Sequence, residues 1–83
     1  MEYEYLFTKM LYDILKTLIK GRVFTKIIDD KLVINITTRE GINYERVVGD
    51  FANKLITGQI SPDVEAYAVL REYKECIRKH FFY

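Results

Sequence analysis

Residues 23 to 37 alternate strictly between two sets of side chains, and this period of two predicts a β-hairpin. The two runs are rich in β-branched residues, which favour strands, and Asp29-Asp30-Lys31 between them forms a tight polar turn. Val23, Thr25 and Ile27 fall on one side of the first run, and Leu32, Ile34 and Ile36 fall on one side of the second. An apolar sheet side of this kind must be covered by other elements of the fold.

Residues 42–48 fit two patterns. Alternation joins Ile42, Tyr44, Arg46 and Val48, whereas helical spacing joins Tyr44, Val47, Val48, Phe51, Ala52 and Leu55. The turn residues favour the strand, because Arg39-Glu40-Gly41 suits a hairpin loop and Gly49-Asp50 suits the start of a helix. We therefore expect a third strand over 42–48 and a short helix over 50–57, ended by Gly58.

The segment 3–20 is expected to form a helix that ends at Gly21. Its broad apolar face comprises Tyr3, Leu6, Phe7, Met10, Leu11, Ile14 and Leu18. A neighbouring flank carries Tyr5, Tyr12 and Ile19, and the polar strip is Glu2, Lys9, Asp13, Lys16 and Lys20. A helix with so much apolar surface either lies at the centre of the fold or buries its second flank in another molecule.

The last helix has a clear beginning, because Ser61 can cap it and Pro62 suits its first position. Its apolar stripe is Ala66, Val69, Leu70, Tyr73, Cys76, Ile77 and His80. The predicted fold class is α+β, a single compact domain over residues 1–83 with the order α-β-β-β-α-α. Its sheet is a three-stranded antiparallel meander packed on one face by helices.

Charge and cysteine content exclude several classes of protein. The chain has 13 Lys plus Arg against 12 Asp plus Glu, which argues against a polyanion binder driven by bulk charge and against an acidic DNA mimic. A single cysteine forms no internal disulfide, and no apolar run is long enough to span a membrane. With its acidic start, the sequence is expected to be a cytoplasmic protein that does not contact membranes.

Catalytic and metal-binding patterns are weak. Cys76 and His80 lie four residues apart on one helix face, but a structural zinc needs four ligands and the chain has no other Cys or His. No glycine-rich phosphate loop or isolated pair of carboxylates is present. We therefore expect no metal, no cofactor and no enzymatic activity.

Aromatic residues point instead to a protein partner. Tyr3, Tyr44 and Tyr73 fall on predicted core faces, whereas other tyrosines lie off the apolar stripes, and exposed tyrosine favours interfaces. The residues 80–83 form an aromatic tail, which we expect to pack on the first helix or on the sheet edge, the alternative being an interface. The candidate partner-binding residues are Tyr5, Tyr12, Ile19, Tyr67, Phe82 and Tyr83. A homodimer through the flank of the first helix that carries Tyr5, Tyr12 and Ile19 is a further possibility.

Nucleic-acid binding is the alternative. The element order resembles that of double-stranded RNA-binding domains, in which lysines at the start of the helix after the third strand grip phosphates. Here that stretch, residues 49–54, holds one lysine and an aspartate. A second basic strip comprises Lys16, Lys20, Arg22 and Lys26, although these charges equally suit a helix C-terminus and a solvated surface.

Four segments, 31–36, 41–44, 51–58 and 73–83, carry a resemblance to a known class of proteins. In style and length the chain resembles the small orphan proteins of phages and prophages of low-GC Gram-positive bacteria, which include anti-CRISPR inhibitors. This resemblance implies a stoichiometric inhibitor that occludes a host defence nuclease or complex by protein–protein contact in the bacterial cytoplasm.

Overall fold

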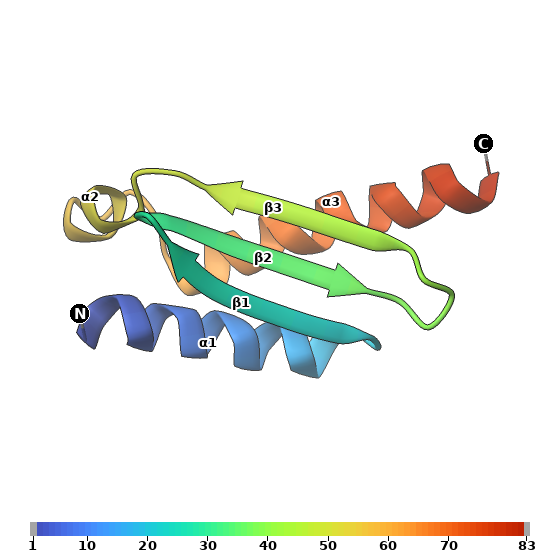
Figure 1. Cartoon of the computed structure of the whole chain (residues 1–83), viewed down its shortest axis with the longest axis horizontal. Coiled ribbons are helices and arrows are strands. Elements are labelled where there is room, and N and C mark those ends of the chain that lie inside the picture. Colours follow the sequence, from blue (N-terminus) through green and yellow to red (C-terminus); the bar gives the residue numbers. More distant parts are fainter. Residues whose placement is uncertain (1, 83) are drawn as a thin grey trace.

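Three helices and three strands build the fold in the predicted order α-β-β-β-α-α (Figure 1). The structure is a computed structural model that describes residues 2–82, and for residue 82 it describes the backbone alone. The elements are α1 (Glu2–Leu18), β1 (Arg22–Ile28), β2 (Lys31–Thr37), β3 (Asn43–Val48), α2 (Phe51–Ile56) and α3 (Pro62–Phe82). The predicted α+β class and the strand over 42–48 are therefore confirmed. No helix within the described residues is both long enough and apolar enough to cross a membrane.

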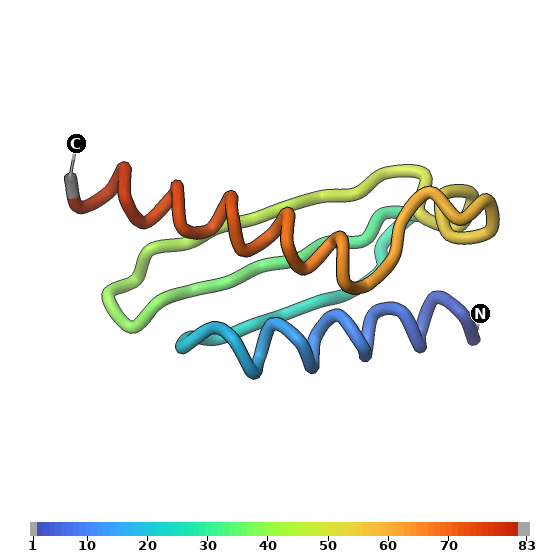
Figure 2. Tube along the Cα trace, turned by 180° about the vertical axis from the view of Figure 1, so that it is seen from behind, coloured from blue at the N-terminus to red at the C-terminus, as the bar shows by residue number. Residues whose placement is uncertain are grey.

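The sheet is an antiparallel meander in the order β1-β2-β3. Val23 lies opposite Ile36, which in turn lies opposite Tyr44, so these three residues share one side of the sheet. Both long helices, α1 and α3, cover that inner side, and the other side of the sheet is bare (Figures 1 and 2). This confirms the predicted sheet with helices on one face only.

The core lies between the inner side of the sheet and the two long helices. From α1 and the residue directly after it, a series at intervals of four residues is buried: Phe7, Leu11, Leu15 and Ile19. From α3, the buried apolar residues are Ala66, Val69 and Tyr73. Edge-to-face ring pairs, with centroids 5.1 Å apart for Phe7–Phe51 and 6.2 Å for Tyr44–Tyr73, tie the helices and the sheet together.

The orientation of α1 differs from the sequence-based expectation. Tyr3 is 76% exposed and Met10 is 52% exposed, although both were expected in the core, whereas Ile19, expected on an outer flank, is 6% exposed. The cause is the position of α3, which begins part-way along α1, so that only the later part of α1 has α3 beside it (Figure 2). The sheet therefore receives the side of α1 centred on Leu11 and Leu15.

The two hairpin connections follow the turn chemistry of the sequence. Asp29 and Asp30 have φ angles of 48° and 58°, which is the geometry of a two-residue hairpin turn with both central residues left-handed. Asp30 also begins α2, because its backbone carbonyl accepts from the Phe51 N–H at 3.0 Å and its carboxylate accepts from the Ala52 N–H at 2.8 Å. Asp50 itself makes no capping hydrogen bond, so the expected start of α2 is right in position while its cap comes from Asp30.

Gly21 has a different role from the expected helix terminator. The helix α1 ends at Leu18, and Gly21 does not have the positive φ of a left-handed cap. A Cβ atom at Gly21 would lie 2.9 Å from the backbone oxygen of Thr37. Glycine is needed here because the chain passes so close to the end of β2 as it enters β1.

We predict that Gly21→Ala lowers the free energy of unfolding by about 1–3 kcal/mol, because the added methyl group meets a backbone carbonyl that cannot move alone. Gly49→Ala is the matched control, since a Cβ at that position meets nothing within 4 Å and Gly49 has no positive φ. Urea denaturation of both variants measures the difference. Equal stability of the two variants would contradict the close approach at Gly21.

Candidate functional site

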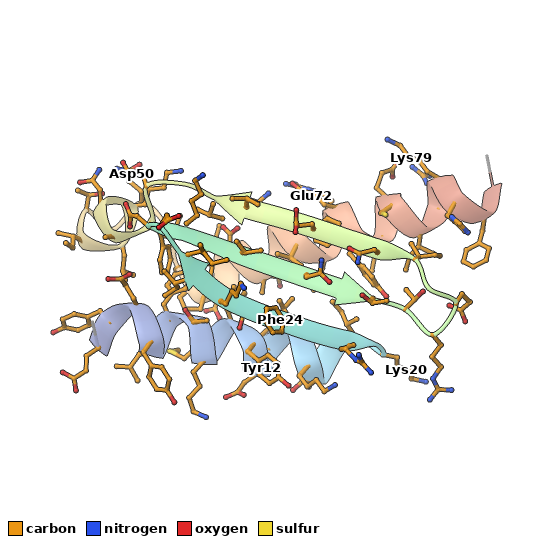
Figure 3. The ribbon with its side chains drawn as sticks, viewed as in Figure 1. Tyr12, Lys20, Phe24, Asp50, Glu72 and Lys79 are labelled. Carbon is orange, nitrogen blue, oxygen red and sulfur yellow. The ribbon has the colours of Figure 1, made fainter. Side chains whose placement is uncertain are left out.

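A polar cluster on the helix-covered side of the sheet joins β3 to α3. The guanidinium of Arg46 donates from Nε to Glu65 Oε1 at 2.5 Å and from Nη1 to Glu72 Oε2 at 2.7 Å. The hydroxyl of Tyr44 donates to Glu72 Oε1 at 2.6 Å. Four side chains from two elements thus form one connected network, and Figure 3 shows Glu72 beside β3.

The charged and polar groups of this network satisfy one another's hydrogen-bonding capacity. The hydrogen bond to Glu65 raises the pKa of Arg46 above its usual value, and the hydrogen bond from Tyr44 lowers the pKa of Glu72. Burial, followed by the bond to Glu72, raises the pKa of Tyr44. Glu65 is 4% exposed and already paired with Arg46, so the cluster has few hydrogen-bonding groups left to bind a substrate. Its evident effect is to fasten α3 to β3.

The position of Arg46 in the sequence indicates this cluster, although no site was predicted there. Arg46 lies on the same alternating side of its strand as Tyr44 and Val48, and therefore points toward the helices rather than into water. A cation on an apolar strand side requires a buried acidic partner. Glu65 and Glu72, two turns apart on α3, supply it.

We predict that Arg46→Met costs about 3 kcal/mol of stability, because it leaves the buried Glu65 carboxylate without its partner. The double variant Arg46→Met, Glu65→Leu recovers most of this loss, since it replaces the pair by apolar side chains. Glu72→Gln costs less than about 1 kcal/mol, because that carboxylate is nearly half exposed. A double-mutant cycle by urea denaturation measures the three values, and a neutral Arg46→Met would exclude a buried pair.

The Cys76–His80 pair does not form a common site. Cys76 is half-buried, with Sγ 3.9 Å from the carbonyl oxygen of Asn43, whereas His80 is exposed and packs edge-on against the Phe81 ring. His80 was expected on the apolar stripe and lies outside the core, because α3 extends past the end of the sheet at this point (Figure 1). Within residues 2–82 no three His, Cys, Asp or Glu side chains group together in a way that could hold a metal ion.

The bare side of the sheet carries apolar side chains that the sequence analysis did not assign to a site. Phe24 and Val47 are each 51% exposed and Ile28 is 41% exposed. They surround a shallow hollow of about 470 Å³ together with Val33, and charged residues such as Lys26 and Glu45 lie among them. Figure 3 shows Phe24 on β1 within this surface, which we call the open sheet face.

A second hollow, of about 520 Å³, lies between α1 and the edge strand β1. Tyr5, Tyr12 and Ile27 contribute to its lining, so two of the predicted partner-binding residues come together there. Ile19, predicted with them, is buried in the core because it continues the series of Leu11 and Leu15 toward the sheet. The prediction of Ile19 as a contact residue was therefore wrong.

The remaining predicted contact residues lie elsewhere. Tyr67, 75% exposed, lies on α3 in a groove beside α1, on the opposite side of α1 from Tyr5 and Tyr12. Phe81 is 54% exposed and lines a hollow with Tyr73 and Ile77 of its own helix. The predicted packing of the aromatic tail on α1 is not seen at Phe81, and the side chains of Phe82 and Tyr83 lie outside the described residues.

Three of the four residues predicted to bind nucleic acid line the same hollow. Lys16, Lys20 and Arg22 line a hollow of about 770 Å³ with Arg39 from the β2–β3 loop, which sequence reasoning had not included. Lys26 lies apart from them, with its ammonium group 5.8 Å from the ring of Phe24 on the open sheet face. Lys16 Nζ donates to the carbonyl oxygen of Gly21, three residues beyond the end of α1, at 3.3 Å.

Comparison with known proteins gives no relative: no family model, no curated protein and no solved structure matches the chain.

Proposed function

We propose that this chain is a non-catalytic protein that acts by binding another protein through its open sheet face. The observation that carries the proposal is the composition of that face. An antiparallel sheet with one side in water normally alternates apolar side chains inward and polar ones outward. Here the outward positions include Phe24, Ile28 and Val47, each at least 41% exposed. A cluster of exposed apolar side chains rimmed by charges is typical of an interaction site.

The shape and the rim of the open sheet face support a protein as the ligand. Its hollow is shallow and broad, and Lys26, Lys31 and Glu45 of both charge signs stand at its margin. Small-molecule sites are deeper and enclose their ligand, whereas protein interfaces combine an apolar centre with a polar rim. The adjoining groove with Tyr5 and Tyr12 extends the same surface around the edge strand β1.

The absence of catalysis is part of this proposal. The ionisable groups with shifted pKa values in the described chain include Arg46, Glu72 and Tyr44, which already satisfy one another. The remaining one, Tyr73, packs in the core, where burial raises its pKa. Binding that occupies a surface stoichiometrically needs none of these groups. The resemblance to small phage and prophage proteins narrows the proposed role to an anti-CRISPR-like inhibitor that covers a host defence nuclease or complex.

We predict that the double variant Phe24→Lys, Val47→Lys abolishes capture of a protein partner from a Gram-positive bacterial lysate treated with nuclease. Both residues are exposed, so the variant should keep its fold, as judged by circular dichroism. The control is Ile56→Lys, which places the same charge at a 75% exposed apolar residue of α2. Stoichiometric capture of one protein by the wild type and the control but not by the double variant supports the proposal. Equal capture by all three proteins contradicts it.

A second candidate function is nucleic-acid binding, favoured by the convergence of Lys16, Lys20, Arg22 and Arg39 around one hollow. We predict for this function that affinity for a DNA or RNA duplex falls with salt by about 0.9 log units per log unit of salt for each phosphate contact. The double variant Lys20→Glu, Arg39→Glu should reduce that slope and the affinity together. Fluorescence anisotropy at several salt concentrations measures both, and binding that is absent at low salt removes this candidate.

A further inference from the structure

An exposed apolar stripe follows the length of α1 beside the residues that face the core. Its residues are Tyr3, Leu6, Met10 and Leu18, which are 76%, 49%, 52% and 58% exposed, with the half-buried Ile14 between the last two. Their spacing of three and four residues keeps them on one side of the helix.

The two halves of the stripe have different surroundings. Along the second half, α3 lies beside α1, and together they form a groove of about 530 Å³. The groove is lined by Ile14, Leu18, Asp63, Ala66, Tyr67 and Leu70. Along the first half, α3 has not yet begun (Figure 2), and the exposed side chains of Tyr3 and Leu6 form an apolar ridge. The first half of α1 thus presents an apolar ridge, and the second half presents a largely apolar groove.

We propose that two copies of this chain associate through α1, antiparallel and with Met10 near the two-fold axis. Reversed about Met10, the stripe superposes on itself, so that Leu6 faces Ile14 of the second copy and Tyr3 faces its Leu18. The ridge of each copy then enters the groove of the other, in the self-complementary manner that a two-fold interface requires. This inference does not rest on the proposed function, because it uses the opposite side of the molecule.

The charges beside the stripe select the antiparallel arrangement. The polar strip of α1 contains Glu2, Lys9, Asp13 and Lys16, all exposed. In antiparallel packing about nearly the same centre, Lys9 faces Asp13 of the second copy. Symmetry doubles this pair of opposite charges. In a parallel two-fold dimer the polar strips of the two helices lie on opposite sides of the seam, so that Lys9 and Asp13 do not meet.

The exposed area suffices for a stable dimer. A standard interface buries roughly 800 Å² on each partner. The stripe, together with Tyr67 of α3, presents two tyrosines and three aliphatic or thioether side chains that are half to three-quarters exposed. Since a large aromatic side chain alone can bury about 150–250 Å², these five residues provide an area of that order.

Sedimentation equilibrium of the full chain tests the association. The wild type should show twice the monomer mass, and Leu6→Glu or Met10→Glu should give a folded monomer, because both residues are about half exposed. Phe24→Glu on the open sheet face is the matched control and should remain dimeric. A wild type that is monomeric up to about 1 mM overturns the proposal. So does a dimer that only the Phe24 variant dissociates.

A charge swap tests the antiparallel register. Lys9→Asp alone and Asp13→Lys alone each create two repulsive pairs per dimer and should weaken association at least about tenfold. The double variant Lys9→Asp, Asp13→Lys restores opposite charges across the axis and should recover the dissociation constant of the wild type. Full additivity of the two single effects would overturn the register.

Disulfide trapping in a Cys76→Ser background provides an independent readout. Met10→Cys should cross-link two copies on mild oxidation, because position 10 meets itself near the axis. Tyr3→Cys should not, since fourteen helical residues separate position 3 from its equivalent position along the partner helix, about 20 Å. Cross-linking of both variants at equal rates indicates parallel helices and overturns the antiparallel arrangement.

Discussion

The apolar inner side of β2 is the constraint on which the other elements depend. Leu32, Ile34 and Ile36 are completely buried, and β2 is the strand to which both β1 and β3 are hydrogen-bonded. Burying each such side chain contributes about 1.5–3 kcal/mol, which a small domain needs from every core position. The strand register places Val23, Tyr44 and Val48 beside them, and the two long helices pack over the resulting surface. A slip of one residue in β2 would expose all three side chains at once.

The sequence allowed the elements to be predicted because their signals are local. Alternation, the turn residues Asp29 and Asp30 and the cap at Ser61, whose Oγ accepts from the Val64 N–H at 3.3 Å, each act within a few residues. The rotation of α1 could not be predicted in this way, since its apolar arc is broader than the sheet can cover. Which part of that arc is buried depends on where α3 begins, and this is a property of the tertiary structure.

The candidate sites likewise combine residues that are close together in the sequence with residues that only the fold brings together. Lys16, Lys20 and Arg22 are near neighbours in sequence and were identified together, whereas Arg39 joins their hollow from a loop and was missed. The tyrosines drew attention because tyrosine is common at interfaces, yet Ile19, grouped with two of them, is in the core. Phe24 and Val47 were overlooked because they occupy the outward positions of their strands, which are ordinarily polar.

The two hydrogen bonds that Asp30 accepts from the start of α2 make this helix dependent on the hairpin. Six residues are too few for a helix to persist by itself in water. The amides of Phe51 and Ala52 are held by the carbonyl and the carboxylate of a turn that lies more than twenty residues earlier in the chain. Hydrogen exchange at these two amides therefore requires the β1–β2 turn to separate from α2. The hairpin and α2 consequently behave as one cooperative unit of the fold, although β3 lies between them in the sequence.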